Sequence, residues 1–245
     1  MDTTVFQLII VLFTAHLMGD FLFQNAWLAR LKKKSFWALL LHSLVHAALA
    51  YLLVGRWVLW LLSMVIFVSH TLIDLVKFRI KQDNLLAFFL DQLSHLAVIV
   101  LVVVFYLAPR GIEPLWFEIA PQAAPKAAIF FTALILLTQA GGILMDYFVR
   151  PFQAQINLHY RSNKRGLAEG GKTIGWLERM LIFVFVLTGQ PAGVGFLIAA
   201  KSIFRFGELK DSENRKEAEY IIIGTFASFL FALLVSLLTK WALAI

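Results

Sequence analysis

The sequence predicts an all-α fold, a polytopic transmembrane helical bundle of about eight helices with both termini outside. Of the 245 residues, 60% are hydrophobic and only 15% are charged, which is far more apolar than an ordinary globular domain. Apolar runs of about 20 residues, long enough to cross a bilayer core, recur along the chain. Basic residues gather in short stretches between these runs, and this alternation indicates the orientation.

We expect one integral membrane domain, with a front half at 1–108 and a rear half at 126–245. The expected front crossings are 5–24, 36–54, 57–77 and 85–106. The expected rear crossings are 126–149, 173–188, 192–205 and 220–244. The first run lacks a basic n-region and a small-residue cleavage site, so we interpret it as a mature helix rather than a signal peptide.

The connections between these runs decide which side each faces. Four are basic: 30–34 ("RLKKK"), 77–81 ("KFRIK"), 150–172 and 201–216. By the positive-inside rule these face the cytoplasm, which places both termini outside. The Pro-containing stretch 109–125, with "EPLWFEIAP", reads as an outside loop with an interfacial amphipathic piece.

The formal net charge of +7 does not indicate nucleic-acid binding. The basic residues lie beside helix ends, where topology and anionic lipid headgroups explain them. Membrane lipids are therefore the expected partners, and nucleic acid is excluded. The absence of Cys excludes thiolate metal ligands and disulfides. The sequence leaves the oligomeric state open.

Each front crossing carries one polar pair at i, i+4 spacing, within "HLMGDFLFQ", "HSLVH", "HTLID" and "DQLSH". The pairs are His16 and Asp20, His42 and His46, His70 and Asp74, and Asp91 and His95. On an α-helix this spacing puts both side chains of a pair on one face. At 1.5 Å per residue, the groups fall about 5 to 17 Å inside the cytoplasmic boundary, although neighbouring helices run in opposite directions. The four pairs therefore share one band of depth.

Three interpretations of this band remain open. Isolated ionisable groups at such depth cost at least a few kcal/mol each, so they should pair or bind something. They could form a structural hydrogen-bond network, a proton or ion pathway, or a metal site. Imidazole and carboxylate are the usual ligands of Zn, Mn and Fe, so we favour a divalent transition metal as cofactor. The candidate metal ligands are His16, Asp20, His42, His46, His70, Asp74, Asp91 and His95.

The rear half contributes charged side chains near the same expected membrane face. Together with Gln24, the candidate substrate-binding residues are Glu178, Arg179, Lys201 and Arg205. Interhelical ion pairs, such as Glu178 with Lys201 or Arg205, would explain them structurally. The functional interpretation is a cationic rim that binds an anionic substrate such as a lipid phosphate, because guanidinium groups suit phosphate geometry.

The stretch 166–173, "GLAEGGKT", fits the P-loop pattern. That pattern implies phosphate binding only when a buried strand precedes it and a helix follows. A charged loop precedes it here, so we reject nucleotide binding and expect Thr173 to cap the sixth helix. The remaining histidine, His159, lies in this loop and is expected to be solvated.

Several of these elements carry a family resemblance. "AHLMGDFLFQ", "LLHSLVHA", "DQLSH", "IGWLER", "AAKSIFRFGEL" and "AEYIIIGT" resemble the bacterial integral membrane family catalogued as domain of unknown function 3307. The resemblance implies a bacterial inner-membrane location and no reaction. The HxxxH and HxxxD elements are more loosely similar to membrane-bound metal-dependent hydrolases.

The residues favour metal-dependent hydrolysis of an anionic or lipid-linked substrate as the function, with Asp20 or Asp74 as catalytic base. The alternatives are a transporter or channel for metal ions or protons, a di-iron enzyme acting on lipid chains, and a non-catalytic membrane scaffold.

Overall fold

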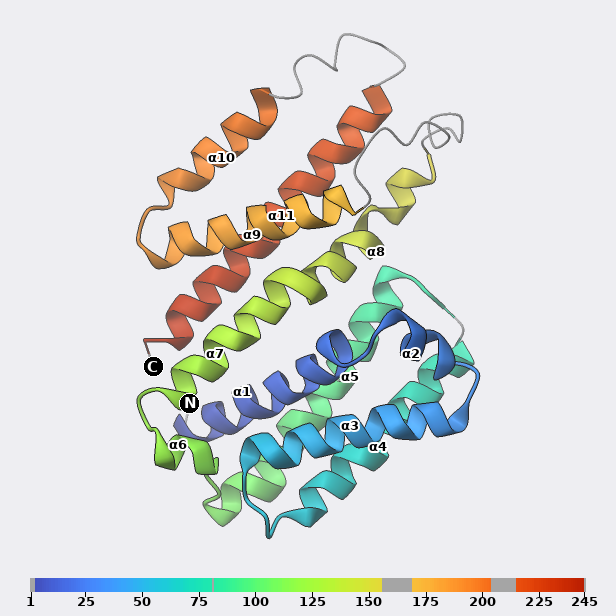
Figure 1. Ribbon diagram of the computed structural model, residues 1–245, viewed down its shortest axis with the longest axis vertical. Coiled ribbons are helices and arrows are strands. Elements are labelled where there is room, and N and C mark those ends of the chain that lie inside the picture. The colour runs from blue at the N-terminus through green and yellow to red at the C-terminus, as the bar shows by residue number, and fades with distance from the viewer. Residues whose placement is uncertain (1–2, 81, 156–168, 204–214, 245) are drawn as a thin grey trace. The chain divides into compact units, whose positions relative to one another are not determined.

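The computed structural model describes residues 3–80, 82–155, 169–203 and 215–244, and within these ranges every regular element is helical (Figure 1). The chain forms two compact units, Met1–Ile135 and Leu136–Ala244. The all-α fold predicted from composition is therefore confirmed for the described residues.

Unit 1 contains the four polar front helices, the helix α7 and several shorter helical segments. Its elements are α1 (Thr3–Leu17), the π-helix η1 (Met18–Leu22), α2 (Ala26–Leu31), α3 (Phe36–Val54), α4 (Trp60–Ile80), α5 (Leu85–Val102), the π-helix η2 (Val103–Leu107), the 3-10 helix η3 (Ala108–Arg110), α6 (Leu115–Ile119) and α7 (Ala124–Ile135). The sequence analysis assigned 126–149 to the rear half. The structure instead places α7 in unit 1, where Thr132 Oγ1 lies 2.5 Å from Thr14 Oγ1 of α1.

Unit 2 is also helical in its described part. Its elements are the π-helix η4 (Leu136–Ala140), α8 (Gly141–Gln153), α9 (Gly170–Leu187), α10 (Ala192–Ile203) and α11 (Arg215–Ala242). The helix expected from Thr173 begins earlier, at Gly170, and Glu169 occupies the capping position, so the prediction that Thr173 caps it is wrong.

Among the residues that the structure describes, six helices are long and apolar enough to cross a membrane. They are Thr3–Leu22, Phe36–Val54, Trp60–Ile80, Leu85–Arg110, Ala124–Gln153 and Ala218–Ala242. The expected crossings at 173–188 and 192–205 correspond to α9 and α10, which are not among the six. α10 has only 12 residues, and α9 contains Lys172, Glu178 and Arg179. A multi-pass membrane protein is thus supported, while the full set of eight crossings stays a prediction.

Local signals explain where the front helices begin and end. The side chains of Asn25, Ser35 and Asn84 accept hydrogen bonds from the backbone N–H groups of Leu28, Ala38 and Ala87. These are N-caps, and they fix the starts of α2, α3 and α5. α3 stops at Gly55, whose φ of 69° lies in the left-handed region that glycine adopts without steric cost.

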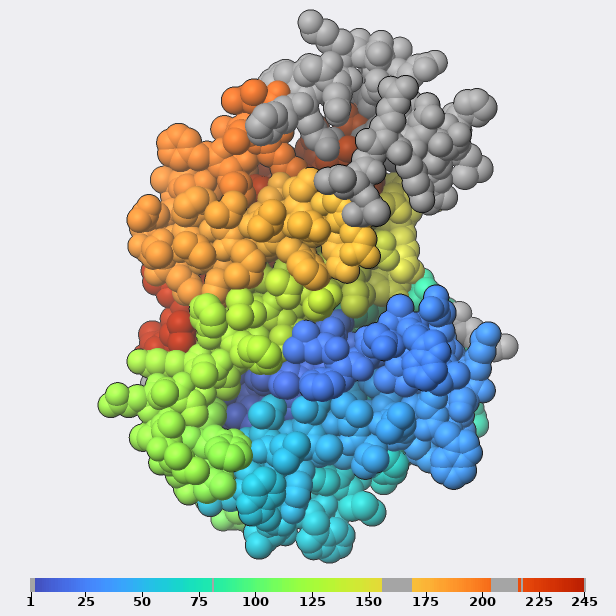
Figure 2. Space-filling model, in the orientation of Figure 1, coloured from blue at the N-terminus to red at the C-terminus, as the bar shows by residue number. Residues whose placement is uncertain are grey.

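Apolar side chains form a buried cluster in unit 1 and also cover the outer faces of its helices. Leu12, Leu62, Ile66 and Ile99 belong to a buried apolar cluster drawn from α1, α4 and α5, with Ala50 and Val54 from α3. The outward faces of the same helices are also apolar, and Trp37 of α3 is 78% exposed. One such outer face is seen over α3, in light blue, in the space-filling view (Figure 2). Exposed apolar side chains on spanning helices suit contact with lipid.

Candidate metal centre

The structure brings the four polar pairs of the front helices together. All eight residues are buried, with no more than 9% of any one exposed. They come from α1 (His16), η1 (Asp20), α3 (His42 and His46), α4 (His70 and Asp74) and α5 (Asp91 and His95). Helical spacing of i, i+4 aims both members of a pair inward, and the meeting of four such helices produces one cluster.

The five imidazole rings are in close contact. The ring centroids of His46 and His70 lie 3.7 Å apart in a stacked arrangement, and those of His70 and His95 lie 4.3 Å apart. His16 stacks on His95 at 4.8 Å, and His42 meets His46 edge to face at 4.7 Å. Two charged rings at these distances would repel each other strongly in a buried site. Neutral imidazole is the form that binds metal ions.

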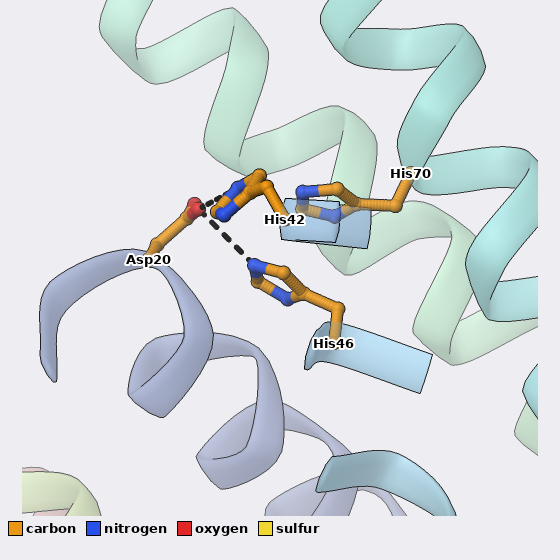
Figure 3. Close-up of side chains that lie close together, drawn as sticks. All are labelled: Asp20, His42, His46 and His70. Atoms are coloured by element: carbon orange, nitrogen blue, oxygen red, sulfur yellow. Dashed lines mark ion pairs between the residues drawn. The ribbon is translucent and has the colours of Figure 1, made fainter. Parts of the chain in front are cut away.

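Asp20 is the carboxylate closest to His42 and His46, as the dashed lines in Figure 3 show. Its Oδ1 lies 3.2 Å from His42 Nε2 and 3.3 Å from His46 Nε2. Its Oδ2 lies 3.6 Å from His16 Nε2. Asp20 belongs to the π-helix η1, a local widening of the helix that is frequent at functional sites.

Four ring nitrogens in this cluster have no hydrogen-bond partner among the described residues. They are the Nε2 atoms of His42, His46, His70 and His95, all buried. The close approaches of His42 and His46 to Asp20 do not have the directionality of a hydrogen bond. His95 Nδ1 lies 2.8 Å from the backbone oxygen of Asp91, and because a carbonyl only accepts, Nδ1 carries the hydrogen. His95 Nε2 therefore holds a lone pair.

The spacing of these atoms fits metal coordination. One ligand atom from each of Asp20, His42, His46 and His70 lies within 4.8 Å of all the others. Ligand atoms about 2.1 Å from a tetrahedral metal ion are about 3.4 Å apart, close to the separations of Asp20 Oδ1 from His42 and His46. His70, Asp74 and His95 form a second group that meets the same limit and shares His70. The buried cluster could therefore hold a metal ion.

Two of the predicted carboxylate ligands are paired with lysines. Lys32 Nζ donates to Asp74 Oδ2 at 2.8 Å, and Lys77 Nζ donates to Asp91 Oδ2 at 2.5 Å. Asp74 Oδ2 is farther from the histidines, at 3.9 Å from His42 Nε2 and 4.0 Å from His70 Nε2. Asp20 makes no such ion pair with a lysine or arginine of the described chain, so it is the carboxylate most available to the cluster.

Lys32 was not among the predicted site residues, because its run "RLKKK" was interpreted only as a cytoplasmic loop. It follows α2 directly and is 7% exposed. A local signal was present in the sequence. Asn25 caps the short helix α2. Lys32, directly after the last residue of α2, is four positions from Leu28, so the two side chains share one face. Leu28 is buried as well.

Gln92 is a second residue that the sequence analysis passed over, although it lies within "DQLSH". Its Nε2 donates to Asp20 Oδ2 at 3.1 Å and contacts Asp91 Oδ2 at 3.3 Å. Its Oε1 lies 3.3 Å from His16 Nε2. Gln92 thus links His16, Asp20 and Asp91, and this link could not be read from i, i+4 spacing alone.

Gly19 is required by the close approach of a neighbouring ring. A Cβ atom built at Gly19 would collide with the imidazole of His46. The missing side chain lets α3 bring His46 directly against the backbone of η1, next to Asp20. In the sequence, Gln24 follows Asp20 at the same four-residue spacing that separates Asp20 from His16, but η1 stops at Leu22 and Gln24 lies outside any helix.

A small cavity lies beside the rings. Its volume is about 20 Å³, and its lining includes His16, His46, His70 and His95. A cavity of this size accommodates about one water molecule. The cluster therefore leaves room for a small ligand next to the unpartnered ring nitrogens.

The predicted rear residues lie in unit 2 or outside the described ranges. Lys201 Nζ donates to Glu178 Oε2 at 2.8 Å, which is the expected interhelical ion pair. Arg179 is buried within unit 2. Arg205 and His159 lie outside the described residues, as does most of the loop before α9. The described part of the chain contains no strand that could precede a P-loop, and Lys172 pairs with Glu169 at 3.3 Å.

Comparison with known proteins identifies a family for the front of the chain. Residues 8–119 match the model of the family described as "Protein of unknown function (DUF3307)". The resemblance expected from the sequence is thereby confirmed over a range that contains every member of the candidate metal centre. No curated protein and no solved structure matches the chain. The looser likeness to membrane-bound metal-dependent hydrolases rests on the HxxxH and HxxxD elements alone.

Proposed function

We propose that unit 1 binds a divalent transition metal ion, Zn, Mn or Fe, and uses it to hydrolyse an anionic or lipid-linked substrate. We place this activity at the cytoplasmic leaflet of a bacterial inner membrane, from the alternation of basic loops and the family resemblance. The observation that carries the metal proposal is the set of four buried Nε2 atoms without a hydrogen-bond partner among the described residues, two of which lie 3.2 and 3.3 Å from Asp20 Oδ1. Such atoms are costly to bury unless they bind something.

The residues divide into ligands and groups that hold the ligands. Asp20, His42, His46 and His70 would bind the ion, with His95 as a further donor through its Nε2 lone pair. His16 and Gln92 both contact Asp20 Oδ2 and would fix the orientation of that carboxylate. Groups that orient ligands in this way tune metal affinity.

When bound, the ion would polarise a substrate oxygen and acidify a water molecule. The cavity beside the rings has room for that water. Asp74 is the proposed proton acceptor, since Lys32 Nζ holds its carboxylate in place at 2.8 Å while its Oδ2 lies 3.9 Å from His42 Nε2. Lys77, which is 35% exposed at its side chain, provides a cation at the edge of the site that suits an anionic substrate. Gln24, whose buried Oε1 lacks a partner among the described residues, is a further proposed substrate contact.

A transporter of protons or metal ions is the second candidate. It is favoured by a chain of polar contacts from the partly exposed Lys77 through Asp91 and Gln92 to Asp20. A relay of this kind is common among intramembrane carboxylates and histidines. Beyond the rings, however, the same helices are closed by the apolar cluster that contains Leu12, Leu62 and Ile99. This apolar end is why we place hydrolysis first.

The proposal is tested by measuring phosphate release from a short-chain lipid phosphate monoester by purified protein loaded with Zn²⁺, Mn²⁺ or Fe²⁺. We expect release that stops on adding a chelator and in the Asp20→Asn variant, and that persists in Lys240→Gln, an exposed lysine of unit 2. Metal-loaded protein that releases no phosphate but carries ions into liposomes would replace hydrolysis with transport.

A further inference from the structure

Unit 2 contains a cavity of its own, apart from the metal centre. Its volume is about 780 Å³, within the range of small-molecule sites. Its lining combines apolar side chains, such as Ile143, Met145 and Val149 of α8, with the cationic Lys172, Arg179 and Lys201. A cavity with apolar walls and cations suits an amphiphile with an anionic head.

Arg179 is the most informative residue of this lining, because it is 3% exposed. Its Nε donates to the backbone oxygen of Leu137 at 2.5 Å, and its Nη1 donates to Ser228 Oγ at 3.0 Å. Both acceptors are uncharged. Within the described part of the chain, no carboxylate oxygen lies within 4.0 Å of the guanidinium. A buried charge without a counter-ion is strongly unfavourable, so an anion is expected beside it.

The nearby carboxylates are committed to other cations. Glu178 precedes Arg179 in sequence, but its carboxylate is held by Lys201 at 2.7 Å. Asp146 also lines the cavity and is held by Arg150 at 2.8 Å. Arg179 therefore has no ion pair with a carboxylate among the described residues of unit 2.

The backbone around Arg179 is shaped to admit the guanidinium. A Cβ atom built at Gly175 would lie 3.1 Å from its Nη1, and one built at Gly141 would lie 3.3 Å from its Nε and closer still to Leu136 O and Phe231. The carbonyl acceptor, Leu137, belongs to the π-helix η4, an irregular helical turn of the type found at functional sites. Two glycines and a π-helix together allow a bulky charged group to lie among packed helices.

A second unsatisfied donor lies on the same cavity. Trp176 Nε1 is buried and has no hydrogen-bond partner among the described residues, and Trp176 is part of the lining. A Cβ built at Gly142, also part of the lining, would lie 3.6 Å from this nitrogen, so the nitrogen lies beside that part of the cavity wall. The hydroxyl of Ser228 accepts from Arg179 and can donate its own hydrogen. Three donors of hydrogen bonds thus line one cavity.

We propose that the unit 2 cavity binds a phosphate-bearing amphiphile, with the phosphate held by Arg179, Trp176 and Ser228 and the chain lying along the apolar wall. Guanidinium binds phosphate oxygens with matched planar geometry, and an indole N–H adds a directed donor. This site does not depend on the metal centre. Its occupation is measurable whether or not unit 1 binds metal.

The test is titration calorimetry of the purified full chain with short-chain phosphatidic acid, short-chain phosphatidylcholine and inorganic phosphate. We expect binding of phosphatidic acid that Arg179→Gln weakens at least about tenfold, the loss of one charge-assisted hydrogen bond. Phosphatidylcholine should bind more weakly, because its choline cation opposes the guanidinium. The Lys240→Gln variant should bind phosphatidic acid as the wild type does.

Because Arg179 is buried, its substitution could unfold unit 2, so a second variant is needed. Trp176→Phe keeps an aromatic side chain but removes the N–H together with the five-membered ring of the indole, and in protein that circular dichroism shows to be folded it should weaken phosphatidic acid binding by about threefold to tenfold. Inorganic phosphate that binds as tightly as phosphatidic acid would overturn the amphiphile and leave a free anion site. Unchanged affinity in both Trp176→Phe and a folded Arg179→Gln would overturn the site itself.

Discussion

The ammonium of Lys32 lies 2.8 Å from Oδ2 of Asp74, and both side chains are buried beside the imidazole cluster. The two residues are 42 positions apart, so the ion pair ties the short helix α2 to the middle of unit 1. Lys32, from the basic run that we expect to face the cytoplasm, thus pairs with a carboxylate inside the candidate site. Two of the three carboxylates there have a lysine partner, which leaves Asp20 to the histidines.

Replacing Lys32 with Met should destabilise unit 1, because Asp74 would keep a buried charge without a partner. The expected loss is about 3–5 kcal/mol of unfolding free energy. Thermal unfolding in detergent measures it. Lys33→Met is the matched control, since the adjacent Lys33 is exposed and should change stability little. Equal unfolding temperatures for the two variants would show that the ion pair contributes nothing.

Gly19 is not a proposed metal ligand, but replacing it with Ala should weaken metal binding. The added Cβ collides with the His46 ring, so either η1 or His46 must move away from Asp20. We expect at least about tenfold weaker metal binding, consistent with the sensitivity of metal sites to the groups that orient their ligands. Gly195→Ala is the control, because no heavy atom outside its own stretch of helix lies within 4 Å of a Cβ built there. Metal binding unchanged by both substitutions would contradict the close approach.

The helices that carry the site could be predicted from the sequence because each combines a long apolar run with a polar pair at i, i+4 spacing. Apolar runs gave the spans, and the i, i+4 pairs gave the inward faces, so the five rings meet as their spacing indicates. Spacing predicts a face on one helix. It does not say which neighbouring group that face meets.

What could not be predicted depends on departures from regular helix and on long-range pairing. The π-helix η1 ends before Gln24, and no residue pattern in "MGDFL" predicts a π-helix. Lys32 and Lys77 were interpreted as topology signals, yet each pairs with a carboxylate of the cluster. In the rear half, charges on α9 and the short length of α10 kept both from the set of spanning helices. Long-range pairing of this kind is fixed by tertiary packing alone.

The basic connections predict the orientation of the chain, and this prediction is directly testable. A membrane-impermeant maleimide added outside intact cells should label Cys at Gln122 and not Cys at Lys33, both exposed positions. The native chain has no Cys, so each variant carries a single label site. Outside labelling at position 33 would reverse the proposed orientation.

The P-loop pattern around Lys172 should be without function. The Lys172 ammonium pairs with the exposed Glu169 and lies over the Trp176 ring, 5.1 Å from the ring centroid. We expect no micromolar binding of ATP or GTP in equilibrium dialysis. Nucleotide binding that Lys172→Ala abolishes would contradict this.

The central claim is that buried imidazoles of unit 1 bind a metal ion, and the most direct measurement is the metal content of protein purified without chelator. We expect at least about one Zn, Mn or Fe per chain. His46→Ala and His95→Ala should lower both this content and the unfolding temperature, since a metal that binds only the folded state stabilises it. His159→Ala should change neither. Wild-type protein without stoichiometric metal, together with His46→Ala and His95→Ala variants that lose only stability, would contradict the claim and leave a structural hydrogen-bond network.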